Sequence, residues 1–154
     1  MINFTKGDLL NSDCQALVNT VNCVGVMGKG IAFQFKKTFP ENFRQYKEAC
    51  DKGEVFTGRM FVTQHKSPFY SIWIVNFPTK EHWRNSSNIE WIRDGLIDLR
   101  LFIEDNHIES IAIPPLGCGN GGLNWIDIKA LIIDILGYMK HVNIMVYEPD
   151  QWQN

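Results

Sequence analysis

Several features are missing from this sequence of 154 residues, and each absence excludes a class of protein. No apolar run approaches the roughly 20 residues that a transmembrane helix needs. The first six residues lack the basic and then apolar layout of a secretory signal peptide. We therefore expect a cytoplasmic protein that does not associate with a membrane.

Cysteine and histidine are few and scattered. The four cysteines form no C-x-x-C pair, which favours reduced thiols over a disulfide framework. The four histidines lie far from the cysteines in sequence and lack the i, i+4 spacing of helical metal ligands. We expect no metal and no cofactor. The residues concerned are Cys14, Cys23, Cys50, Cys118, His65, His82, His107 and His141.

The sequence also lacks an excess of positive charge and both common nucleotide-binding motifs. The formal net charge is −2, so any contact with nucleic acid needs a local basic patch. Gly25 precedes Gly28 and Lys29 by too few residues for a P-loop, and Gly30 stands where that motif has Ser or Thr. No G-x-G-x-x-G opens a helix, so the dinucleotide-binding motif is absent as well.

What the sequence does contain is an alternation of strand-like and helix-like segments. With 45% hydrophobic and 21% charged residues, the chain can bury the core of one domain, residues 1–154. Segments rich in β-branched and aromatic residues predict strands at 2–5, 16–22, 59–64, 71–77, 110–116 and 143–147. Apolar periodicity predicts helices at 30–38, 41–52 and 87–106, and another from 125 or 127 to 138. This order predicts an α/β domain with a buried central sheet.

Two helix starts carry their own signals. Ser87 and Glu90 have the spacing of a capping box, which predicts that the third helix begins there. Asp127 is expected in the first turn of the last helix, where an acidic side chain interacts favourably with the helix dipole.

Two glycine-rich loops, 22–30 and 114–122, each begin at or near the end of a predicted strand. In open α/β sheets, ligands lie beyond the carboxyl ends of the strands, where loops and helix N-termini present backbone N–H groups. Either loop alone could be a tight turn. Two such loops in one small domain favour the binding of an anionic diphosphate.

A third cluster, Lys80, Glu81, His82, Trp83 and Arg84, follows the strand at 71–77 and opens on the same edge of the predicted sheet. A loop of charged residues is usually solvated surface, and a tryptophan there either packs on the domain itself or binds a partner. An aromatic ring beside a guanidinium suits stacking on an unpaired base and contact with its phosphate.

These three loops, with the segment KGDLL at 6–10, resemble a known family. The matching motifs are ALVNTVN at 16–22, GVMGKGIA at 25–32, NFPTK at 76–80 followed by HWR at 82–84, and PPLGCG at 114–119. The sequence resembles the macrodomains, and within them the DarG branch, the antitoxin macrodomains of the DarT/DarG toxin–antitoxin system. The likeness runs from about Ile2 to Pro149.

The resemblance implies a three-layer α/β/α fold with a mostly parallel, mixed central sheet and a cleft for ADP-ribose. It implies that Asp8 accepts a hydrogen bond from the adenine amino group, that Asn22 contacts the distal ribose, and that both glycine loops hold the diphosphate and that ribose. The implied ADP-ribose contacts are Asp8, Leu9, Asn19, Gly25, Val26, Met27, Gly28, Lys29, Gly30, Leu116, Gly117, Cys118, Gly119, Asn120, Gly121, Gly122 and Leu123.

DarG-like macrodomains hydrolyse ADP-ribose from thymidine bases in single-stranded DNA. By likeness, Lys80 and Asn22 are the catalytic residues, and His82, Trp83 and Arg84 contact the DNA. The implied partners are ADP-ribose, ADP-ribosylated single-stranded DNA and a cognate DarT toxin. We expect a monomer, which either stands alone or forms the N-terminal part of a longer antitoxin.

The sequence departs from the protein-directed relatives at one point. Those relatives resolve a lysine adduct with a carboxylate in the second glycine loop, but no acid lies between Leu116 and Ile126 here. Lys80 could attack the anomeric carbon as a neutral amine, which needs a lowered pKa. Alternatively, it stays charged and stabilises the departing base.

Three functions fit these motifs: a DNA ADP-ribosyl hydrolase, a non-catalytic ADP-ribose reader and a hydrolase for ADP-ribosylated glutamate on proteins. Lys80 favours an enzyme, because binding adenine and diphosphate does not require a lysine on that edge. The sequence HWR at 82–84 favours DNA over protein.

Overall fold

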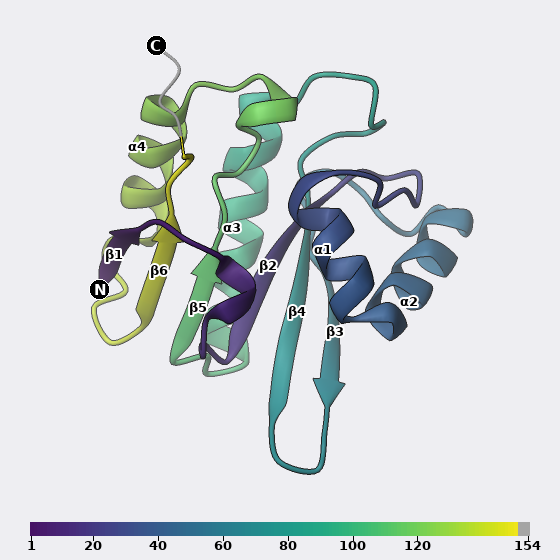
Figure 1. The fold of residues 1–154 in the computed structure, drawn as a ribbon. Coiled ribbons are helices and arrows are strands. Elements are labelled where there is room, and N and C mark those ends of the chain that lie inside the picture. Colours follow the sequence, from purple (N-terminus) through teal and green to yellow (C-terminus); the bar gives the residue numbers. More distant parts are fainter. Residues whose placement is uncertain (151–154) are drawn as a thin grey trace.

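The computed structural model describes residues 1–150, so 151–154, the end of the expected domain, lie outside the described residues. Six strands form one sheet: β1 (Ile2–Thr5), β2 (Ala16–Val21), β3 (Phe61–Lys66), β4 (Ser71–Pro78), β5 (Ser110–Ile113) and β6 (Asn143–Tyr147). Their order in the sheet is β1-β6-β5-β2-β4-β3 (Figure 1). Neighbouring strands are parallel except β3 and β4, which are antiparallel. The mostly parallel, mixed sheet is thus confirmed.

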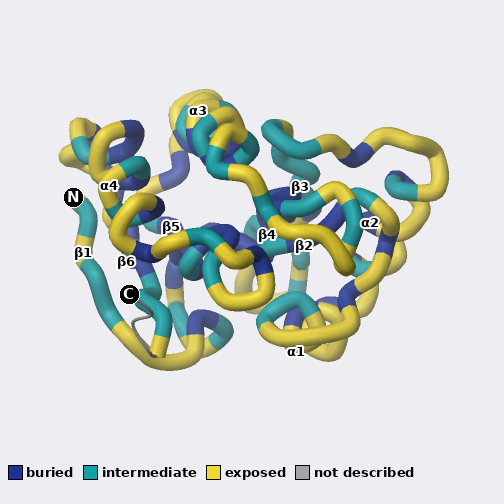
Figure 2. Tube along the Cα trace, turned by 90° about the horizontal axis from the view of Figure 1, so that it is seen from above, coloured by how far each residue is buried: buried dark blue, intermediate teal, exposed yellow. Residues whose placement is uncertain are grey.

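The four α-helices among the described residues cover the two faces of the sheet, as the view along the sheet in Figure 2 shows. Alternate residues of β2 explain this, because successive side chains of a strand point to opposite faces. Ala16 and Val18 pack with α3 (Ile89–Asp105) and α4 (Trp125–Leu136). Leu17 packs on the other face with Phe35 of α1 (Gly30–Thr38), and Val21 packs there with α2 (Pro40–Asp51). The three-layer α/β/α arrangement is confirmed.

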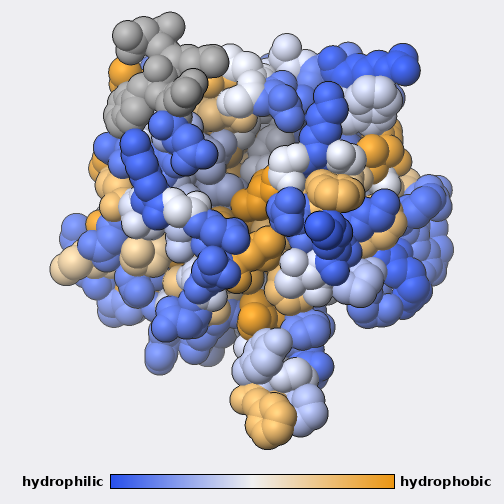
Figure 3. Space-filling view, in the orientation of Figure 1, coloured by the Kyte–Doolittle hydropathy of each residue, from blue (hydrophilic) through white to orange (hydrophobic). Residues whose placement is uncertain are grey.

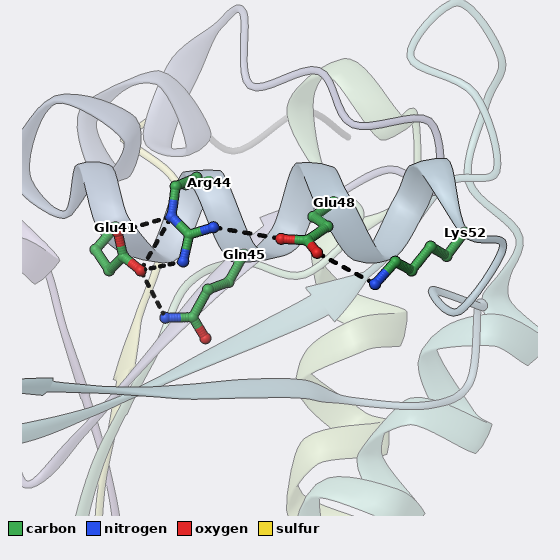
Figure 4. Close-up of polar contacts among 5 residues, drawn as sticks. All are labelled: Glu41, Arg44, Gln45, Glu48 and Lys52. Carbon is green, nitrogen blue, oxygen red and sulfur yellow. Dashed lines mark hydrogen bonds and ion pairs between the residues drawn. The ribbon is translucent and has the colours of Figure 1, made fainter.

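The α1 and α2 face has one polar and one apolar part. Along the outer side of α2, ion pairs link Glu41 to Arg44, Arg44 to Glu48 and Glu48 to Lys52 (Figure 4). These groups are exposed, so they mark the solvent side of the helix more than they stabilise it. Apolar surface lies instead between α1 and the 3-10 helix η1 (Leu9–Asn11), as Figure 3 shows.

Two predicted strand boundaries were wrong, and the end of β5 has a clear cause. Strand β5 ends at Ile113, because Pro114 and Pro115 have no N–H to continue the ladder. Strand β3 spans Phe61–Lys66, two residues later than predicted.

The capping box was also wrong. Asn88 caps α3, its side chain accepting from the Glu90 N–H at 2.9 Å, while the Ser87 hydroxyl donates to the Thr79 carbonyl. Asp127 does lie in the first turn of α4.

Candidate functional site

Three loops leave the sheet side by side. Strands β5, β2 and β4 are adjacent and parallel, so their carboxyl ends meet at one edge, hereafter the carboxyl edge. The loop after β2 is the first glycine loop, that after β5 is the second glycine loop, and the β4 loop runs from Thr79 to Asn88. All the loops that the sequence singled out therefore belong to one site region.

Asn22 shapes the first glycine loop from inside. Its buried side chain donates to the Val26 carbonyl at 2.8 Å and accepts from the N–H groups of Val24 and Val26 at 3.1 and 3.3 Å. The hydroxyl of Tyr46 in α2 donates to the same side-chain oxygen at 2.9 Å. Gly25 takes a φ of +87°, which few other residues adopt. The Asn22 amide is thus engaged in holding the loop, and its contact with a ribose stays a prediction.

The first glycine loop ends at the N-terminus of α1. Lys29 precedes the helix with extended backbone and makes no side-chain capping hydrogen bond. The first turn of a helix leaves N–H groups without intrahelical partners and carries the positive end of the helix dipole. Lys29 adds a full positive charge, and Gly28, Lys29 and Gly30 are all exposed. This end of the loop suits an anionic group.

The second glycine loop is built from left-handed turns. Gly117, Gly119 and Gly122 have φ values of +73°, +73° and +78°. At Gly117 a side chain is also excluded by space, because a Cβ there would lie 2.7 Å from Cδ1 of Leu123. Gly119, Asn120 and Gly122 are exposed, while Leu116, Gly117 and Gly121 are buried. Backbone at an exposed tip can approach a ligand closely.

The β4 loop is fastened to both glycine loops. The Thr79 N–H donates to Val21 at 2.9 Å, and the Cys23 N–H donates to the Glu81 carbonyl at 3.1 Å. On the other side, the Ser87 N–H donates to the Gly121 carbonyl at 2.9 Å. These backbone hydrogen bonds hold the segment that carries Lys80 between the two glycine loops.

Lys80 lies at the centre of this arrangement. A Cβ built at Gly121 would be 3.9 Å from its Cε, and its ammonium donates to the Trp83 carbonyl at 3.4 Å. Partial burial, followed by the positive charge of Lys29, lowers the pKa of Lys80 below its ordinary value of 10.5. The structure therefore places between the glycine loops a lysine whose neutral amine is more populated at a given pH than that of a free lysine.

His82, Trp83 and Arg84 form a layered group next to Lys80. The rings of His82 and Trp83 stack at 5.2 Å between centroids, and the Arg84 guanidinium carbon lies 4.7 Å from the Trp83 ring centroid. Trp83 is 45% exposed, so it is not packed into the domain. An exposed indole with a neighbouring guanidinium can stack on a base and contact its phosphate.

The other candidate residues lie deeper or have local partners. Asp8 accepts from the Leu10 N–H at 3.0 Å and caps η1, and Leu9 is buried. Asn19 is wholly buried in β2 and donates to the side-chain oxygen of Asn76, which also accepts from Asn42. The structure thus places Asn19 in a polar core network instead of at the surface of the loops.

The positioning roles of Tyr46 and Ser87 were not predicted from the sequence, and two cysteines lie near the site. Nothing in the sequence around Tyr46 indicates its hydrogen bond to Asn22. Ser87 was predicted to cap α3, but its hydroxyl donates to Thr79 instead. Cys118 lies in the second glycine loop, but burial raises its pKa to about 11, and burial raises that of Cys23 to about 11 as well. Both thiols are protonated near neutral pH and are poor nucleophiles.

Two further properties concern residues 1–150 only. No helix in this part is long and apolar enough to cross a membrane. No group of three or more His, Cys, Asp or Glu side chains gathers there in a way that could hold a metal ion.

Comparisons with known proteins agree with the resemblance that the sequence motifs indicate. The family model for the Macro domain matches residues 18–132. Curated proteins called DNA ADP-ribosyl glycohydrolase from Thermus aquaticus and Mycobacterium tuberculosis are 48% and 50% identical over 97% of the chain. The aligned residues cover 41% and 42% of those relatives, so the chain spans about two fifths of their length.

Solved structures agree with the sequence matches. The macrodomain of Mycobacterium tuberculosis DarG superposes with a TM-score of 0.94 at 49% identity, covering 97% of this chain and 99% of that one. Thermosipho africanus DarTG in complex with ADP-ribose has a TM-score of 0.91 at 32% identity, covering 99% of this chain and 43% of that one. The curated relative from that organism is called a DNA ADP-ribosyl transferase-DNA ADP-ribosyl glycohydrolase fusion protein, 32% identical over 96% of this chain and 42% of that protein.

Proposed function

Because this chain belongs to the macrodomain family, with the fold of DarG macrodomains, we propose that it removes ADP-ribose from thymidine bases of single-stranded DNA. In this role it acts as antitoxin to a DNA ADP-ribosyltransferase. The names of the curated relatives, DNA ADP-ribosyl glycohydrolase, support the removal of ADP-ribose from DNA.

One observation carries the assignment of an enzyme. Lys80 is held by backbone hydrogen bonds between the two glycine loops, beside Gly121, and its pKa is lowered. A reader of ADP-ribose needs donors for the diphosphate and a partner for adenine, which the loops and Asp8 can supply. It does not need a partly desolvated lysine, whose burial costs free energy.

The two glycine loops hold the diphosphate in this proposal. The exposed N-terminal end of α1 and the exposed glycines of the second loop supply N–H groups, and Lys29 supplies charge. Asp8 accepts from the adenine amino group. The relative from Thermosipho africanus, whose structure is described as a complex with ADP-ribose, supports this choice of ligand.

Lys80 acts as an amine nucleophile. The neutral amine attacks the anomeric carbon of the distal ribose, the bond to the thymine ring nitrogen breaks, and that nitrogen takes up the proton that the amine loses. Water then adds to the same carbon, the bond to Lys80 breaks, and ADP-ribose and the free amine are regenerated. No carboxylate of the second glycine loop takes part, since that loop has no acid.

Trp83 and Arg84 bind the DNA part of the substrate. The exposed indole offers a face for a base, and the guanidinium beside it can pair with a phosphate. Because the net charge is −2, this local group and not the overall charge of the domain attracts the strand.

The expected setting is the cytoplasm, with the domain working as a monomer and opposing a DarT-type toxin. The four cysteines are free thiols, which suits a reducing compartment. The fusion relative, which joins a transferase to a glycohydrolase in one chain, supports a functional pairing of the two activities.

Incubation with two substrates tests this function. The protein is mixed with single-stranded DNA ADP-ribosylated on thymidine and, separately, with protein ADP-ribosylated on glutamate, and released ADP-ribose is measured by mass spectrometry. We expect release from DNA. Release from protein alone would assign the site to protein substrates, and binding of ADP-ribose without release from either would make the domain a reader.

A further inference from the structure

A second aromatic ring with an arginine beside it lies on the segment between α2 and β3. Phe56 is 50% exposed, and the Arg59 guanidinium carbon lies 5.5 Å from its ring centroid. The Arg59 N–H donates to the Phe56 carbonyl at 3.4 Å, so a turn brings the two side chains together. Both residues are exposed, and no role in folding or in the proposed reaction accounts for them.

This turn forms one wall of a hollow, and α3 forms the other. Phe56, Thr57, Gly58, Arg59 and Asp94 line a cavity of about 340 Å³. Gly58 has a φ of +83°, and a Cβ there would lie 3.1 Å from Cβ of Asp94. The close approach of Gly58 thus sets the carboxylate of Asp94 beside Phe56 and Arg59.

The hollow opens near the carboxyl edge. The segment that lines it, residues 56–59, lies just before Phe61, the first residue of β3. Phe61 pairs with Asn76, which is near the carboxyl end of β4. The backbone of Thr57 lies close enough to the Cys23 thiol to lower its pKa slightly against the larger effect of burial. Cys23 in turn contacts the backbone of Lys80 and Glu81. Cys23 therefore lies between Thr57, which lines the hollow, and the segment that carries Lys80.

Given the proposed action on single-stranded DNA, we infer that this hollow binds a nucleotide flanking the modified thymidine. The ring of Phe56 stacks on the base, and Arg59 pairs with a backbone phosphate. Asp94 accepts N–H groups from the edge of the base, as carboxylates do from the amino group of cytosine. A flanking base that carries an amino group is preferred for this reason.

The chemistry of the lining favours a nucleotide over a purely anionic or purely apolar ligand. An isolated phosphate would meet the negative charge of Asp94 as well as the positive charge of Arg59. A nucleotide separates the two, with its phosphate at the arginine and its base at the carboxylate. Phe56 with Arg59 also repeats the pairing of Trp83 with Arg84, so two like platforms lie on either side of the Cys23 contact.

Comparison of a long and a minimal substrate tests this inference. The wild type, Phe56→Ala and Arg59→Ala are assayed on ADP-ribosylated thymidine and on a single-stranded oligonucleotide of about ten residues with one modified thymidine. Each variant should raise KM for the oligonucleotide at least about fivefold, the lower range for one stacked base, and leave kcat and the rate on the nucleoside unchanged. Asp94→Asn should reduce the preference for cytosine over thymine beside the modified base.

Matched controls come from the same chain. Phe69→Ala removes another highly exposed phenylalanine, and Arg100→Ala removes another arginine beside an aromatic ring, Tyr138. Neither should change KM for the oligonucleotide. If Phe56→Ala and Arg59→Ala match the wild type on the oligonucleotide while wild-type hydrolysis is intact, the nucleotide site is wrong and the proposed function stands. If the wild type hydrolyses neither substrate, the proposed function fails and this inference fails with it.

Discussion

The hydroxyl of Tyr46 shares its one proton between the two oxygens of Asn22, at 2.8 Å from the backbone oxygen and 2.9 Å from the side-chain oxygen. Helix α2 thereby anchors the start of the first glycine loop, although Tyr46 follows Asn22 by 24 residues. A residue that is buried and distant in sequence thus determines the shape of a loop proposed to hold a diphosphate.

Tyr46→Phe should weaken the loop without touching the ligand. Loss of one buried hydrogen bond should lower the free energy of unfolding by about 1 kcal/mol and reduce affinity for ADP-ribose. Denaturant unfolding and calorimetry measure the two effects. Tyr138→Phe is the control, because its hydroxyl makes an exposed hydrogen bond to Glu104. Unchanged affinity in a Tyr46→Phe protein that is less stable would show that the loop does not hold the ligand.

Gly119→Glu should abolish binding of ADP-ribose. Gly119 is exposed at the tip of the second glycine loop with a φ of +73°, so glutamate brings both backbone strain and a negative charge. Gly53→Glu carries the same strain and charge at a φ of +70° just after α2, outside both glycine loops, and should bind normally. Equal affinities of the two variants by calorimetry would place the diphosphate elsewhere.

Asp8→Asn should separate the two roles of Asp8. The asparagine oxygen can still accept from the Leu10 N–H and cap η1, so the melting temperature should hold. Its amino group then replaces the second carboxylate oxygen and cannot accept from adenine, so affinity for ADP-ribose should fall by on the order of 1.5 kcal/mol. Affinity for a ligand without adenine should not change. If both ligands are affected equally, Asp8 is only a turn residue.

The activity should rise with pH until Lys80 is neutral. Burial lowers its pKa most and Lys29 lowers it further, so Lys29→Gln should raise that pKa towards 10.5. The rising limb of kcat against pH should then move to higher pH, and the rate near neutral pH should fall. Lys37→Gln, a charge change on the last turn of α1, should leave the limb in place. A limb that stays fixed or moves to lower pH in Lys29→Gln would argue against a neutral amine.

The sequence was sufficient to predict the elements whose apolar residues recur at a regular spacing. The buried face of α3, from Ile92 to Ile103, follows spacings of three and four residues, and the glycine loops follow apolar strands. Ser87 and Asn88 are both good capping residues, and local sequence could not decide between them. Only the hydrogen bond from Ser87 to the Thr79 carbonyl, at the other end of the β4 loop, favours Asn88.

Side-chain partners distant in sequence could not be predicted. Asn19 and Asn22 lie three residues apart in one motif, yet Asn19 enters a core network with Asn76 and Asn42, while Asn22 holds a loop. Strand register and helix placement set this difference. The same applies to Lys80, whose position beside Gly121 depends on how the β4 loop is fastened on both sides.

Turnover of ADP-ribosylated single-stranded DNA by Lys80→Ala, measured beside its affinity for ADP-ribose, tests the central claim most directly. If Lys80 attacks the glycosidic carbon, kcat should fall at least about a hundredfold, in the range for losing a catalytic group, while the Kd for ADP-ribose stays nearly unchanged. Hydrolysis by Lys80→Ala at the wild-type rate would contradict the assignment of Lys80 as the catalytic residue.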